Sequence, residues 1–70
     1  MSEFYNGMAE ILEVDEAEVG PDLVLGKAWD SLAIVSTIAL IDEVYGNTVS
    51  PQKLQECKTV GDVEKLAQEG

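Results

Sequence analysis

The most apolar stretch of the chain covers residues 32–41 and is interrupted only by Ser36 and Thr37. A helix that crosses a membrane needs about 20 apolar residues. This stretch therefore predicts a helix in the protein core, and we expect no membrane insertion. Helical spacing extends the prediction to residues 31–45, with Gly46 in the left-handed position that ends many helices. The predicted buried stripe of this helix is Val35, Ile38, Ile41 and Tyr45.

Three other segments carry apolar residues at helical intervals. They predict helices over about residues 2–14, 51–57 and 60–68, with Ser2 as the N-cap of the first. No segment alternates apolar and polar residues as a half-buried strand does. The residues expected to face the core are Phe4, Met8, Ile11 and Leu12 in the first helix, Leu54 and Cys57 in the short one, and Val60, Val63, Leu66 and Ala67 in the last.

The starts of the last two helices have clear local signals. Ser50 followed by Pro51 is typical of an N-cap and the first helical residue. Thr59 and Asp62 resemble a capping box, in which each side chain bonds the backbone N–H of the other. Gly61 lies between them and is expected to weaken the first helical turn, because glycine has low helix propensity.

A long loop is predicted over residues 15–30, which include Gly20, Pro21 and Gly26 and show no sustained period. Some of its apolar residues should pack beneath the helices. The expected fold class is therefore all-α: one domain over residues 1–70, built as a four-helix bundle with a long loop between the first two helices and a short third helix.

Charge and composition exclude several functions. The 70 residues hold 14 Asp and Glu against 4 Lys and Arg, a net charge of −10, and no His. This balance opposes binding to nucleic acid or to an anionic membrane surface, and it favours basic protein partners. The lack of His removes His-dependent catalytic triads and His-containing metal sites. One cysteine, Cys57, allows no internal disulfide, so we expect a structural thiol and a cytoplasmic location.

A calcium-binding loop is an alternative to consider for an acidic helical chain. The best match to the 12-residue loop pattern places Asp15 at position 1. Gly20 then lies correctly at loop position 6, but the ligand positions 3, 5 and 12 hold Ala17, Val19 and Gly26. We therefore expect no metal site. Neighbouring carboxylates elsewhere are expected to be solvated, and the chain is short for a catalytic cleft, so we expect no enzyme.

The candidate site is Trp29-Asp30-Ser31-Leu32, where the long loop meets the second helix. Free backbone N–H groups and the positive end of the helix dipole would favour a phosphate esterified to Ser31. Asp30 could engage a metal ion or a basic group of a modifying enzyme, and Leu32 could provide an apolar contact. The simpler interpretation is that Asp30 or Ser31 is an ordinary N-cap.

The wider pattern resembles the acyl carrier protein family. The resemblance covers nearly the whole chain: a first helix, a long loop, a helix that begins with Asp30-Ser31-Leu32, a short helix and a last helix led by Thr59-Val60. It implies a carrier with phosphopantetheine, donated from coenzyme A by a phosphopantetheinyl transferase, attached to Ser31. The thiol of this arm would hold acyl groups as thioesters, for loading and transfer enzymes with basic docking patches.

The resemblance also implies a recognition surface on the second helix, here Leu32, Ala33, Ser36, Ala39 and Glu43, with Trp29 either part of it or packed at the junction. Members serving fatty acid biosynthesis commonly carry acids where this chain has Ala33 and Ser36. We therefore expect a specialised pathway, such as polyketide, lipid or lipopeptide biosynthesis. An aminoacyl or D-alanyl carrier and a non-covalent acidic interaction module stay open as alternatives. A free-standing monomer is expected.

Overall fold

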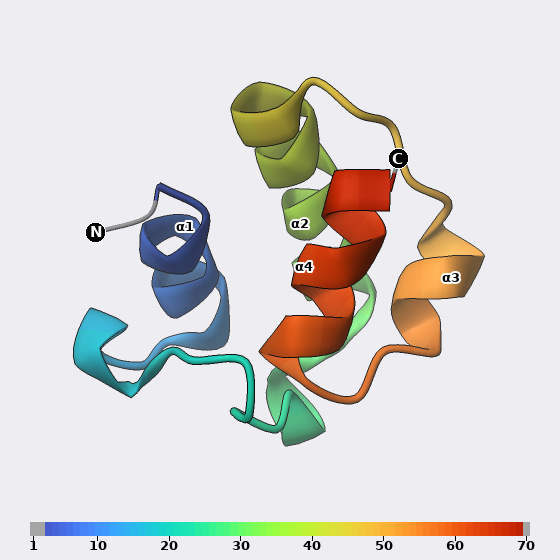
Figure 1. Ribbon diagram of the computed structural model, residues 1–70. Coiled ribbons are helices and arrows are strands. Elements are labelled where there is room, and N and C mark those ends of the chain that lie inside the picture. Colours follow the sequence, from blue (N-terminus) through green and yellow to red (C-terminus); the bar gives the residue numbers. More distant parts are fainter. Residues whose placement is uncertain (1–2, 70) are drawn as a thin grey trace.

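Four α-helices surround one core in the computed structural model, which describes residues 3–69 (Figure 1). In chain order the elements are α1 (Glu3–Leu12), the 3-10 helices η1 (Glu16–Glu18) and η2 (Gly26–Ala28), α2 (Ser31–Tyr45), α3 (Pro51–Gln55) and α4 (Val60–Glu69). Within this part of the chain there is no strand, only an isolated bridge between Val24 and Thr59. The predicted fold class is confirmed, including the long first loop and the short third helix.

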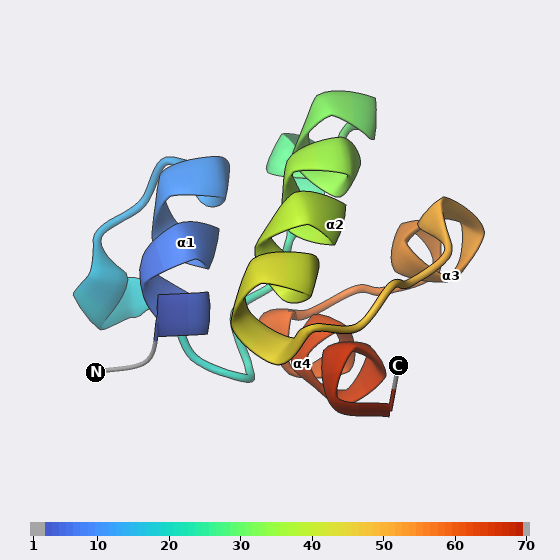
Figure 2. The same ribbon diagram turned by 90° about the horizontal axis from the view of Figure 1, so that it is seen from above.

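The helices are arranged around α2, which contacts each of the other three (Figure 2). Their inner faces supply fully buried side chains, of which the largest are Phe4 and Met8 from α1, Thr37 and Ile41 from α2, Leu54 from α3, and Val60 and Val63 from α4. The loop adds Val19 and Leu25, both buried, as expected for a loop that packs beneath helices. No helix within residues 3–69 is long and apolar enough to span a membrane.

The helix α1 is shorter than the predicted 2–14 range. It ends at Leu12 because Glu13 adopts a left-handed conformation, with φ of 59°. The Val14 N–H then donates to the Ala9 carbonyl at 3.0 Å and the Glu13 N–H to the Glu10 carbonyl at 3.3 Å, the two bonds of a Schellman motif. Nothing in the sequence marks this end, because Glu rarely takes the position. The predicted N-cap, Ser2, lies outside the described residues.

The buried face of α2 differs from the predicted stripe. Val35 is 62% exposed, whereas Thr37 is fully buried with its hydroxyl donating to the Ala33 carbonyl at 2.7 Å. Ile41 is buried as predicted, but the assignment of Val35 to the core was wrong, because apolar residues occur all around this helix and spacing alone could not identify its inner face. Packing against α1 on one side and α3 and α4 on the other selects it. The buried residues are Ala33, Ile34, Thr37 and Ile41, while Ile38 and Tyr45 are half-buried.

The long loop is more ordered than predicted, because it runs along the start of α4. Its backbone accepts hydrogen bonds from two residues of the first turn of α4: Val60 N–H to Leu23 at 3.0 Å and Gly61 N–H to Pro21 at 3.0 Å. These N–H groups have no partner inside the helix. A Cβ on Gly61 would lie 2.8 Å from the Pro21 carbonyl oxygen. The glycine that was expected to weaken the first turn of α4 therefore allows the loop backbone to pack closely against that turn.

The predicted caps of the last two helices are present. Ser50 accepts a hydrogen bond from the Gln52 N–H, and Thr59 and Asp62 form a reciprocal capping box with both bonds at 3.3 Å. The helix α3 ends at Gln55, before the predicted residue 57. Cys57 follows it as a half-buried thiol.

Candidate functional site

The start of α2 is capped by Asp30, not by Ser31. The Asp30 backbone is extended, with φ −107° and ψ −177°, and its Oδ1 accepts the Ala33 N–H at 2.8 Å. The Asp30 carbonyl accepts the Ile34 N–H at 2.9 Å, the first hydrogen bond of the helix. The sequence offered Asp30 and Ser31 as N-cap candidates. The structure assigns the cap to Asp30, and Ser31 is the first helical residue.

Ser31 is consequently exposed and free of any capping role. In the described part of the chain its hydroxyl has no hydrogen-bond partner. The first turn of α2 contains no acidic residue, and its free N–H groups and dipole make this end attractive to an anion. A phosphate ester on the Ser31 oxygen would thus be accessible to a modifying enzyme and electrostatically favoured. The residues at this position fit such a group.

Trp29, two residues before Ser31, connects the end of the long loop to α3 by a hydrogen bond. Its indole N–H donates at 2.7 Å to the Leu54 carbonyl, near the C-terminal end of that helix, which also accepts the Cys57 N–H. The ring is half-buried and packs against the core. The structure therefore gives Trp29 a packing role, and a part in partner recognition stays a prediction. Because α3 and α2 are joined here, the position of Ser31 depends on both helices.

The expected recognition surface of α2 needs one correction. Leu32 is 78% exposed, and Ser36, Ala39 and Glu43 are also exposed, but only 6% of Ala33 is accessible. Ala33 turns inward because it lies one turn before Thr37 and two before Ile41, on the row of α2 that faces the core.

Val35 is an exposed residue that the sequence reasoning missed, since it was assigned to the core. It lies one turn beyond Leu32 on the outer surface of α2 and enlarges the apolar area near Ser31. No feature of the sequence distinguishes it from the buried Ile34, its neighbour, because both are large β-branched residues in one apolar run.

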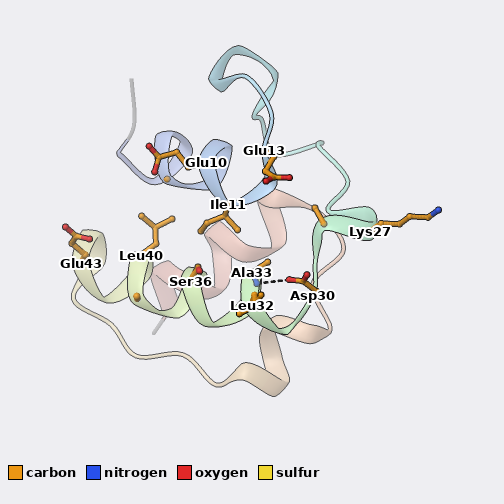
Figure 3. Close-up of a pocket in the computed structure, with 13 residues that line it drawn as sticks. Glu10, Ile11, Glu13, Lys27, Asp30, Leu32, Ala33, Ser36, Leu40 and Glu43 are labelled. Carbon is orange, nitrogen blue, oxygen red and sulfur yellow. Dashed lines mark hydrogen bonds between the residues drawn. The ribbon is translucent and has the colours of Figure 1, made fainter.

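A groove of about 720 Å³ lies between α1 and α2, with Asp30 at one end and Glu43 toward the other (Figure 3). Its α2 side includes Leu32, Ser36 and Leu40. Its α1 side, which the sequence reasoning also missed, is lined by Gly7, Glu10 and Ile11, with Glu13 just after the helix. The candidate site is therefore at the end of a groove made by two helices.

Two further observations concern metal ligands and the single thiol. Among residues 3–69, no group of three or more His, Cys, Asp or Glu side chains is placed to hold a metal ion. Burial, with added repulsion from Asp62 and Glu56, raises the pKa of the Cys57 thiol. A raised pKa disfavours the reactive thiolate, in keeping with a structural thiol.

Comparison with known proteins adds one finding. A family model described as "Phosphopantetheine attachment site" matches residues 3–67. The match includes all four helices except the last residues of α4, as well as the junction at Ser31. No solved structure matches the chain significantly.

Proposed function

The chain belongs to the phosphopantetheine attachment site family, as its resemblance to acyl carrier proteins predicts, and we propose that Ser31 is the residue that bears the arm. Phosphopantetheine is its covalently attached prosthetic group, and the protein is a carrier. The observation that supports Ser31 is the assignment of the cap to Asp30, which leaves an exposed hydroxyl at the first position of α2. When attached, the arm supplies a thiol on which cargo is held as a thioester.

The residues around Ser31 have distinct roles in this proposal. Asp30 holds the first turn of α2 in place and leaves its second carboxylate oxygen for the transferase. The free N–H groups of the first turn stabilise the phosphodiester. Leu32 offers an exposed apolar contact next to the attachment point. The partner enzymes are a phosphopantetheinyl transferase and acyl-transfer enzymes with basic docking patches, to which the net charge of −10 steers the carrier.

We further propose an acyl cargo in a specialised pathway, such as polyketide, lipid or lipopeptide biosynthesis. This is supported by α2, which carries Ala33 and Ser36 where members serving fatty acid biosynthesis commonly have acids, and which has no acid on its outer surface from Leu32 to Ile41. Complementary charges mainly raise the encounter rate and the specificity of such a contact. An aminoacyl or D-alanyl cargo is the alternative.

The attachment site is tested by intact-mass measurement. We expect the protein to gain one phosphopantetheine unit when it is incubated with coenzyme A and a transferase of broad specificity. Ser31→Ala should gain none, whereas Thr48→Ala, which removes an exposed hydroxyl outside α2, should gain one unit. A gain in Ser31→Ala, or none in the folded wild-type protein with any transferase tried, would overturn the proposal.

The pathway is tested by adding charge to the same helix surface. Ser36→Glu combined with Ala39→Glu should raise kcat/KM for loading by fatty-acid-synthesis enzymes by about 1.4- to 5-fold per charge, since exposed ion pairs contribute roughly 0.2–1 kcal/mol. Both positions are exposed, whereas an acid at Ala33 would be buried. Unchanged kcat/KM would contradict the charge argument, and preferential loading with an amino acid would favour the alternative cargo.

A further inference from the structure

The groove between α1 and α2 is longer than the immediate surroundings of Ser31. A second hollow of about 270 Å³ adjoins it near Glu3 and shares several lining residues with it, including Gly7, Leu40 and Glu43. The two helices approach each other closely here, since a Cβ on Gly7 would collide with the Leu40 side chain. The two hollows therefore adjoin at this close approach, and together they follow the α1–α2 boundary as far as Asp30 and Leu32, the neighbours of Ser31.

The charges on the groove are almost all negative. Glu10 and Glu13 lie on its α1 side, and Asp30 and Glu43 on its α2 side (Figure 3). Lys27 is the one basic residue among its lining residues. Like charges on both sides of a concave surface reinforce one another and attract cations.

The surface between these acids is apolar. Ile11 and Leu40 face the groove as half-buried side chains from opposite helices, and Leu32 is largely exposed at the end next to Ser31. An apolar strip bordered mainly by acidic side chains matches an amphipathic segment with apolar residues on one face and basic residues beside them. The phosphate of the arm does not match, since the acids repel it.

We propose that this groove is the docking site for a basic amphipathic segment of a partner protein, and that the segment contacts α1 as well as α2. The inference rests on the proposed function, because a partner that acts on the cargo must bind close to Ser31. It assigns a recognition role to Glu10, on a helix where the sequence pointed to none. The first turns of α2 carry no acidic residue. In this proposal Glu10 and Glu13, on the α1 side of the groove, supply the negative charge that the partner recognises.

The test is an NMR titration of the ¹⁵N-labelled protein with a synthetic helical peptide that has Leu on one face and Lys beside it. We expect backbone amide shifts on both α1 and α2 along the groove. Glu10→Gln and Glu43→Gln should each weaken binding by about 1.4- to 5-fold, as for exposed ion pairs. The matched change Glu56→Gln, at an exposed acid that does not line the groove, should leave affinity unchanged.

Several results would overturn the proposal. They are shifts confined to α2, equal affinity in Glu10→Gln and wild type, or equal binding of a peptide with Glu in place of Lys. Groove shifts on acylation of the arm, with loss of peptide binding, would identify the acyl chain as the occupant and would also overturn it. Ser31→Ala should still bind the peptide. Peptide binding therefore tests the groove proposal, and the mass gain with coenzyme A tests the attachment site, so one proposal can fail without the other.

Discussion

Replacing Gly61 with alanine tests the contact that joins the long loop to α4. By helix propensity alone, Gly61→Ala should stabilise the protein by up to about 1 kcal/mol. The structure predicts the opposite. The new Cβ would lie 2.8 Å from the Pro21 carbonyl oxygen and 3.1 Å from the Pro21 Cβ, and the first of these is a backbone atom that cannot rotate away. The loop must therefore move, and the 3.0 Å hydrogen bond from Gly61 to Pro21 weakens.

The size of the effect follows from these opposing terms. Overpacking costs about 1–3 kcal/mol, and the weakened hydrogen bond adds about 0.5–1.5 kcal/mol. Subtracting the gain in propensity leaves a loss of about 2 kcal/mol in the free energy of unfolding. For a domain of this size, such a loss lowers Tm by about 8–16 °C.

Thermal unfolding followed by circular dichroism measures this change, and Trp29, the single tryptophan, reports on the loop–helix junction by fluorescence. Gly20→Ala is the matched control, because a Cβ there meets nothing within 4 Å. It should be neutral or stabilise the protein by about 0.4–1 kcal/mol through the unfolded state. If Gly61→Ala melts at or above the wild-type temperature, the close approach of the loop does not constrain the fold and the reasoning is refuted.

Three further predictions concern the caps and the charge. Asp30→Ala should lose about 1 kcal/mol of stability, whereas Asp30→Asn, which keeps a capping oxygen, should lose little; equal Tm values for the two variants would argue against the cap. Hydrogen bonds from the Lys58 and Thr59 N–H groups lower the pKa of Asp62 below its ordinary 3.8. A carboxyl with a depressed pKa stabilises the fold above that ordinary value and loses this effect as the pH falls through its folded pKa. The stability difference between wild type and Asp62→Asn in urea unfolding should therefore shrink below about pH 3.8, and a constant difference would contradict this. Finally, added NaCl should raise Tm by screening the net charge of −10, and a melting curve independent of salt would count against this.

Local signals in the sequence were sufficient for much of the fold. The Ser50 cap, the Thr59–Asp62 capping box and the left-handed Gly46 each depend on residues within four positions of one another, and all are present. The attachment residue is a similar case. Asp30-Ser31-Leu32 at a helix start identified Ser31 as the candidate, and the structure added that Asp30 holds the cap, which leaves the serine hydroxyl free.

By itself, then, the sequence determined the all-α class, the helix starts and the identity of the candidate serine, because short-range hydrogen bonds and apolar spacing carry that information. Tertiary structure alone decided that Val35 faces solvent and Thr37 the core, and that acids at the α1 side border the groove beside the site. These features depend on which helices cover α2 and how closely they approach. An apolar pattern that extends all around a helix cannot encode that choice, since only contacts between distant segments distinguish its inner face from its outer one.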